Sequence, residues 1–279
     1  ALAGLLLLAG LFCAGTTSAA RTNRGGALVL HVEGEARYEY GSLANCASLA
    51  LTDPDAAVIE APSDGKVRLV GLYAVFPPDS VGSIKALSYG IRYSPNVRIV
   101  GWGACSGGGL ELLLNAWPAS HGGISVNIDP SAVRESRVIP LYWFALSCLG
   151  PGSFEVIPHP MAKFAGRFVN TDAPPLESPV VDYGRIGFGS PGKLAHPGPT
   201  PPIGPCCLDQ CWLLTPYECE VYSGLWLGEN SRCEEEPCGQ APRLGGCCVD
   251  DGCDALTAVE CARAGGYFLG EGVACPAQG

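Results

Sequence analysis

One short segment of the sequence carries a residue that could act as a nucleophile. Gly103-Ala104-Cys105-Ser106-Gly107 places a thiol on a glycine-rich turn, after an apolar run at Val97–Trp102 and before Leu110–Ala116, which we expect to be helical. A strand, a tight turn and a helix are how a hydrolase of the α/β type presents its nucleophile, and cysteine can replace serine there. The bases within the sequence would be His121 or His159, with Asp172 or Asp182 as the orienting acid. The repeated strand–helix units that such an enzyme needs are missing, so a hydrolase at Cys105 is only our third hypothesis.

The same cysteine has a competing use in a disulfide. Residues 25–190 hold three cysteines, Cys46, Cys105 and Cys148, so one of them must stay unpaired within this part of the chain. Cys148 follows the apolar run Leu141–Leu146, and a buried free thiol is common in such a setting. We therefore predict a bond between Cys46 and Cys105, a reduced Cys148 and no catalytic residue.

Aromatic residues offer a second kind of site. A sugar-binding platform needs aromatic rings exposed on one face, although aromatic residues at strand spacing are mostly core. The residues that could contribute to a platform are Tyr40, Tyr73, Trp102, Trp117, Tyr142 and Trp143.

Cysteine dominates the end of the chain. Eleven of the fifteen cysteines fall after residue 205, a density typical of a disulfide scaffold in an oxidising compartment. The alternative, zinc, is disfavoured because residues 206–279 contain no histidine. The turn Asp250-Asp251-Gly252-Cys253-Asp254 lacks the ordered ligand spacing of a calcium loop. We predict no metal and no cofactor.

These cysteines form two repeats, at 206–238 and 247–279. Five positions match in order, at offsets of 41 or 42 residues: Cys206, Cys207, Cys211, Cys219 and Cys233 with Cys247, Cys248, Cys253, Cys261 and Cys275. The sequence does not decide which cysteines bond to each other within a repeat. Each repeat also contains a Thr-x-x-Glu capping box, at Thr215 and Glu218 and at Thr257 and Glu260, which predicts a short helix that carries Cys219 or Cys261. So short a segment buries too little surface to fold without its disulfides.

The first repeat has a sixth cysteine, Cys238, with four residues between it and Cys233. Four residues also follow Cys275, so we expect the second repeat to be truncated and the natural protein to continue with cysteine. Residues 206–279 would then show one free thiol. The absence of an initiating Met likewise suggests an incomplete N-terminus.

The remaining patterns predict a mainly β protein. Period-two alternation is clearest at Lys85–Tyr93, where Leu87, Tyr89, Ile91 and Tyr93 share one face. Other expected strands are Ala27–Val32, Val67–Phe76, Val97–Trp102, Gly123–Ile128, Arg137–Leu146, Phe154–Ile157 and Val180–Phe188. Many short strands without βαβ alternation favour an antiparallel β-sandwich at 25–190. The six prolines of residues 190–205 predict a flexible, extended linker at 191–205 that separates two independent parts.

Three stretches carry resemblances. The segment IKALSYGIRYSPNVRIVGWG resembles the central strands of cohesin-like and related carbohydrate-binding β-sandwiches, which implies the fold. The wider pattern, with LYWFA, EVIPHP and YGRIGFG, resembles an uncharacterised domain of exported proteins from environmental bacteria. The repeat pattern CC…C…T..EC…G…G…C resembles short Cys-rich repeats of exported bacterial proteins, planctomycete ones among them, and implies no activity.

Location and charge complete the sequence-based picture. Residues 1–20 form an apolar run that ends in Ser18-Ala19-Ala20, as in a cleavable signal peptide, so no membrane span should remain after its removal. The repeats hold twelve acids and three bases, a net charge of −9 that disfavours nucleic acid. We therefore predict a secreted or cell-surface structural or protein-interaction protein without catalytic activity. An extracellular polysaccharide-binding module is the alternative, and the partner is an extracellular protein or glycan.

Overall fold

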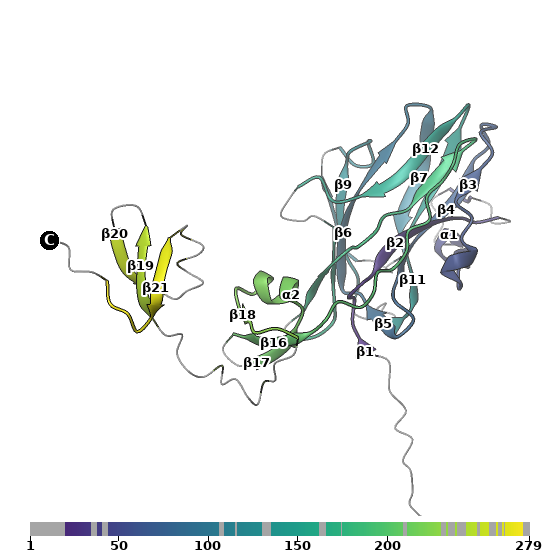
Figure 1. Ribbon diagram of the computed structural model, residues 1–279. Coiled ribbons are helices and arrows are strands. Elements are labelled where there is room, and N and C mark those ends of the chain that lie inside the picture. The colour runs from purple at the N-terminus through teal and green to yellow at the C-terminus, as the bar shows by residue number, and fades with distance from the viewer. Residues whose placement is uncertain are drawn as a thin grey trace, which may run out of the picture.

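The computed structural model shows a two-layered β-sandwich followed by two small disulfide-rich modules (Figure 1). The mainly β, antiparallel prediction is confirmed. The structure describes residues 20–34, 38–40, 44–105, 109–114, 116–129, 135–161, 166–173, 175–208, 211–229, 233, 238, 244–249, 252–256, 261, 264 and 266–275. Residues 1–19, which hold nearly all of the predicted signal peptide, lie outside this set.

The first layer is a four-stranded antiparallel sheet in the order β2-β4-β11-β7. Its strands are β2 (Ala27–Val32), β4 (Arg68–Val75), β11 (Val138–Cys148) and β7 (Val97–Ala104). The central pair, β4 and β11, is almost fully buried. Continuous burial explains why these two segments show no simple alternation of polar and apolar residues.

The second layer is a larger sheet in the order β14-β13-β6-β12-β15-β3, with β9 on the other side of β6 and β8 beyond it. Its strands are β3 (Glu60–Ala61), β6 (Ala86–Tyr93), β8 (Glu111–Leu114), β9 (Gly123–Asn127), β12 (Gly152–Ile157), β13 (Arg167–Val169), β14 (Glu177–Pro179) and β15 (Arg185–Phe188). Leu87, Tyr89 and Ile91 of β6 are buried in the core, on the face that the alternation predicts.

Shorter elements flank the two layers. They are β1 (Ala20–Arg21), β5 (Ser80–Ser83) and β10 (Glu135–Ser136), which form a small sheet, the helix α1 (Ala44–Ala47) and the 3₁₀ turn η1 (Pro54–Ala56). Among the residues that the structure describes, no helix is long and apolar enough to cross a bilayer.

The expectation of a helix at Leu110–Ala116 is wrong. Residues Glu111–Leu114 form β8, which pairs with β9 through Leu112 opposite Ser125 and Leu113 opposite Ile124. A short run of leucines suits a helix or a strand equally, so periodicity alone does not decide between them. The ladder with β9 decides for the strand.

The expectation of a flexible linker is wrong for its first part. Lys193 exchanges two backbone hydrogen bonds with Arg185 of β15, at 2.8 and 2.9 Å. Ala195 is 1% exposed and packs with Leu194 in the apolar cluster on the outer face of β2 and β4. The prolines keep the segment extended, and the apolar pair between them holds it against the sheet.

The two modules share one topology. In the first, β16 (Gly204–Cys207) lies between β17 (Cys211–Leu214) and β18 (Leu225–Trp226), with the helix α2 (Pro216–Val221) between β17 and β18 in the chain. In the second, β19 (Gly245–Val249) lies between β20 (Gly252–Leu256) and β21 (Tyr267–Glu271). The domain boundaries drawn from the sequence remain a prediction.

We predict that trypsin leaves the Lys193–Leu194 bond intact in the folded, oxidised protein. Both backbone groups of Lys193 are held in the bridge to Arg185, and proteases need an extended, released substrate. Peptide mapping by mass spectrometry should detect this cut only after reduction and denaturation. Early cleavage there in the native protein would contradict the ordered linker.

Candidate functional site

The short helix α2 begins at a complete capping box. Glu218 donates its backbone N–H to Thr215 Oγ1 at 3.1 Å, and Thr215 donates its own N–H to Glu218 Oε2 at 2.9 Å. Pro216 occupies the first turn, where its missing N–H costs nothing. Thr215 and Glu218 are therefore both fixed and almost fully buried, at 3% and 1% exposure.

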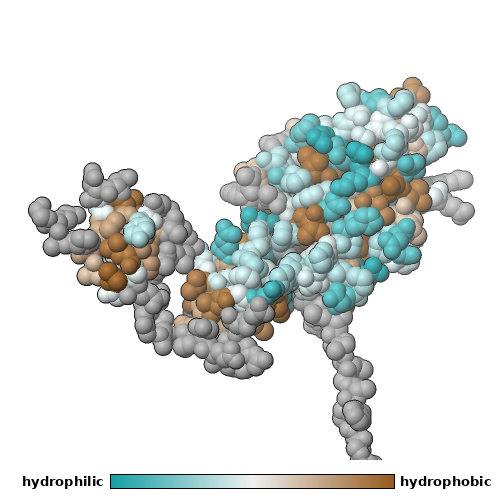
Figure 2. Space-filling model, in the orientation of Figure 1, coloured by the Kyte–Doolittle hydropathy of each residue, from teal (hydrophilic) through white to brown (hydrophobic). Residues whose placement is uncertain are grey.

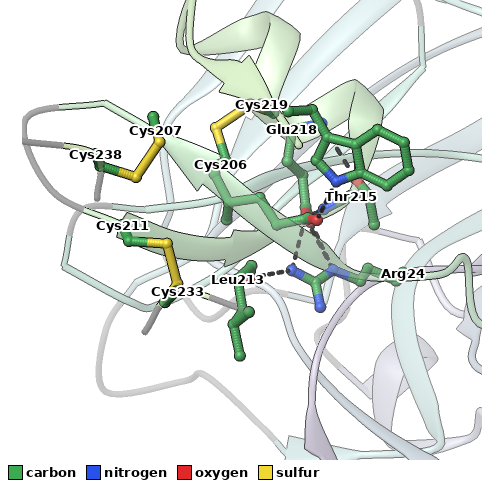
Figure 3. The surroundings of a disulfide bond; sticks show 12 residues. Arg24, Cys206, Cys207, Cys211, Leu213, Thr215, Glu218, Cys219, Cys233 and Cys238 are labelled. Atoms are coloured by element: carbon green, nitrogen blue, oxygen red, sulfur yellow. Dashed lines mark hydrogen bonds and ion pairs between the residues drawn. A yellow bond between two sulfur atoms is a disulfide. The ribbon is translucent and has the colours of Figure 1, made fainter. Parts of the chain in front are cut away.

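The carboxylate of Glu218 also joins the module to the sandwich (Figure 3). Arg24 Nε donates to Glu218 Oε1 at 2.9 Å, and Arg24 Nη2 donates to Oε2 at 2.6 Å. Ser178 of β14 donates its hydroxyl to Oε1 at 3.2 Å, and Tyr222 donates its hydroxyl to the carbonyl of Pro175. One buried carboxylate thus caps its own helix and forms a bidentate ion pair with the sandwich. We call this contact between the first module and the sandwich the joint.

Sequence reasoning identified Glu218 only as a helix cap and did not assign a role to Arg24. The two residues are 194 positions apart, and no local pattern links them. The signal that could have drawn attention was the Leu194–Ala195 pair, since an apolar pair inside a linker indicates that the linker packs against something.

Three disulfides staple the first module. They join Cys206 to Cys219, Cys207 to Cys238 and Cys211 to Cys233. In the second module the disulfide between Cys247 and Cys261 is equivalent to the one between Cys206 and Cys219. Cys248, Cys253 and Cys275 carry thiols, with 2.8 Å between Cys248 Sγ and Cys253 Sγ. The structure therefore has three free thiols in this region where we expected one. Thr257 and Glu260 lie outside the described residues.

The two faces of each small sheet carry different side chains. Opposite pairs in a ladder point to the same face, so Leu225, opposite Cys207, shares a face with Cys211. The other face carries Cys206, which is bonded to Cys219 of α2. In the second module, Tyr267 lies opposite Cys248, just as Leu225 lies opposite Cys207.

Exposed apolar side chains lie on one face of each sheet. Leu225 and Leu213 of the first module are 46% and 55% exposed, and Tyr267 of the second is 73% exposed. Figure 2 shows brown, hydrophobic surface on both modules. We call the face with Leu213 and Leu225, and the equivalent face with Tyr267, the open faces of the two modules.

The hydrolase hypothesis fails because its nucleophile is oxidised. Cys105 is bonded to Cys46, with an S–S length of 2.15 Å and Cα atoms 5.4 Å apart. The other residues of the hypothesis are engaged elsewhere. His159 is 3% exposed, Asp182 pairs with Lys193, and Asp172 accepts a hydrogen bond from Asn170 at 2.6 Å. His121 is next to Ser120, whose hydroxyl lies 3.4 Å from the ring Nδ1.

The third cysteine of the sandwich, Cys148, is reduced and 1% exposed. Its thiol donates to the carbonyl of Gly150 at 3.1 Å, and burial raises its pKa. A raised pKa keeps the sulfur in the unreactive thiol form at neutral pH.

The aromatic platform is not assembled. Tyr73, Trp117, Tyr142 and Trp143 are all core residues with at most 7% exposure. Tyr40 is 90% exposed, and Trp102, in the edge strand β7, is 39% exposed. No group of three or more His, Cys, Asp and Glu suited to a metal occurs among the residues that the structure describes.

Comparison with known proteins gives no function for this chain. No protein-family model and no curated protein matches the sequence. Similar solved structures include the cohesin module of a family 33 glycoside hydrolase from Clostridium perfringens, with a TM-score of 0.38 and 8% identity over 59% of this chain and 96% of that one. They also include a ScaB type I cohesin from Pseudobacteroides cellulosolvens, with a TM-score of 0.32 and 13% identity over 49% and 91%. At this distance nothing about binding follows.

We predict that E218Q weakens the joint by about 3 kcal/mol, because it removes one charge of a buried pair and leaves Arg24 uncompensated. Glutamine can still cap the helix, so α2 itself should persist. E220Q, at an exposed position on the same helix, is the matched control. Thermal unfolding and amide exchange over residues 193–222 provide the measurement. Equal stability of the two variants would show that the ion pair does not hold the joint.

We further predict that the oxidised second module pairs Cys253 with Cys275. In the first module the opposite residues Cys207 and Cys211 are not bonded to each other, and Cys211 bonds to Cys233. Cys253 and Cys275 hold the equivalent positions. Mass spectrometry of a non-reduced digest should find this cross-linked peptide. A Cys248–Cys253 peptide in its place would contradict the equivalence of the modules.

Proposed function

We propose that the protein is a secreted or cell-surface, non-catalytic component that binds other proteins through the open faces of its stapled modules. The observation that carries this proposal is the repetition of the open face, with Leu225 and Tyr267 exposed at equivalent positions. Exposed apolar surface that gathers on one face supports an interaction site, because such patches typically mark sites of protein–protein contact.

The covalent framework suits a binding surface. Cys207 and Cys211 anchor the open face of the first module through bonds to Cys238 and Cys233. A face that disulfides hold in place loses little conformational entropy when a partner binds. The exposed face of the second module can also bind the same partner together with the first, which raises the effective affinity without any new contact.

The sandwich holds the first module, and with it the first open face, in a fixed position. The pair between Arg24 and Glu218 fixes the first module to the sandwich, so the first open face has a defined direction. The five disulfides favour an oxidising compartment, in agreement with export. The alternative, polysaccharide binding, retains one supporting observation, the partial exposure of Trp102 on an edge strand.

The test uses the immobilised, oxidised full chain on a biosensor, with the envelope and secreted fraction of the encoding organism as the probe. We expect the response to disappear when the fraction is digested with protease. L225D combined with Y267D should weaken it by at least about tenfold, because each buried apolar anchor contributes more than about 1 kcal/mol.

The matched control is L110D combined with L149D, two exposed leucines of the sandwich that lie outside the open faces. This control should leave the response unchanged. A response that survives protease and is lost in Trp102→Ala, with glycan-array binding to match, would establish the polysaccharide alternative instead.

A further inference from the structure

A pocket of about 520 Å³ lies on the outer side of the first layer. The end of β2 forms one wall, with His31 and Glu33. The segment Ser48–Ala56, which includes Leu51 and Asp53, forms the other. The pocket is open to solvent on the side of Thr52 and Asp53, both of which are exposed.

Glu33 is the buried polar group of this pocket, with 5% exposure. Tyr73 donates its hydroxyl to Glu33 Oε1, and the N–H of Ala50 donates to Oε2 at 3.3 Å. Gly71 makes room for this arrangement, because a Cβ there would come within 2.9 Å of Oε1 and 2.5 Å of the Tyr73 ring. A carboxylate can accept about four hydrogen bonds, so it retains acceptor capacity toward the pocket.

The imidazole of His31 does not supply a full counter-charge. Its Nδ1 accepts the N–H of Val58 at 2.9 Å, so the neutral ring carries its proton on Nε2, 3.7 Å from Glu33 Oε2. Burial lowers the pKa of His31, although Glu33 opposes this, so the ring is neutral at pH 7. None of the residues described as lining the pocket is Lys or Arg. A buried carboxylate without a cation is costly, and a bound cation would remove that cost.

We propose that this pocket binds the ammonium group of a lysine side chain from a partner protein. An ammonium has three donors and no acceptor, which suits the carboxylate of Glu33 and the other side-chain oxygen atoms of the lining. Asp53 also accepts the N–H of Asp55 at 3.1 Å, and the Ser48 hydroxyl donates to the carbonyl of Ala44 at 3.0 Å, so Glu33 is the principal acceptor. Because Glu33 lies deep in the pocket, an ammonium at the end of a long side chain can reach it better than one on a short side chain can. Leu51 and Ala56 offer apolar contact to the methylene groups of that stem.

The test titrates the oxidised full chain with Nα-acetyl-lysine methylamide and follows binding by NMR. We expect binding to weaken by at least about tenfold when the ligand's ammonium is acetylated, and also in E33Q. D53N should weaken binding less, and D55N, an exposed neighbour outside the pocket, should not change it. If E33Q does not fold, A56W tests the same claim by filling the pocket mouth while leaving Glu33 and Tyr73 in place.

Three outcomes would overturn the proposal. One is equal affinity for the acetylated and free amines. Another is tighter binding of glucosamine than of the lysine analogue, which would make the site one for an amino sugar. The third involves Arg37, the cation closest to Glu33 in sequence, which lies outside the described residues. Binding that occurs only in R37Q would mean that the chain's own guanidinium fills the pocket. The probe is a small amine that is tested at this pocket alone. Its binding can therefore succeed or fail whether or not the open faces of the modules bind a protein.

Discussion

The arrangement of the sandwich and the first module depends on one buried carboxylate. Glu218 accepts hydrogen bonds from Thr215, Arg24 and Ser178, which belong respectively to its own module, the start of the sandwich and strand β14. At 1% exposure this carboxylate is almost entirely removed from water, and the three donors replace the hydrogen bonds that water would make. Removing Arg24 alone would leave a buried charge unpaired, which is strongly destabilising.

The sandwich and the first module are stabilised in different ways. The sandwich buries a continuous core between its sheets, with Tyr89, Phe144 and Phe154 fully enclosed. Its single disulfide, from Cys46 to Cys105, closes a separation of 59 residues and adds about 4 kcal/mol in the chain-entropy model. The first module has only a small cluster around Cys206, Leu214 and Cys219, so its three disulfides must replace most of a core.

Sequence patterns predicted most of the strands, because alternation and turn residues are local signals. They failed at Glu111–Leu114, where only the ladder with β9 distinguishes a strand from a helix. They also failed at Leu194–Ala195, whose packing depends on the outer face of β2 and β4. The capping box at Thr215 and Glu218 could be read from four consecutive residues. The contact with Arg24 could not, since long-range ion pairs leave no local pattern in one sequence.

Comparison of the two modules separates the residues that fold a module from those that attach it to the sandwich. Cys206, Leu214 and Trp226 have Cys247, Leu256 and Phe268 as equivalents in the sequence, so these positions stay apolar in the second module. Trp212 and Tyr222, which pack with Leu176 next to the sandwich, have Asp254 and Ala264 as equivalents. Ala264 has no hydroxyl to donate as Tyr222 donates to Pro175. The second module thus keeps the cysteine pattern and, at Glu260, the counterpart of Glu218 in the sequence, and it lacks the counterparts of Trp212 and Tyr222.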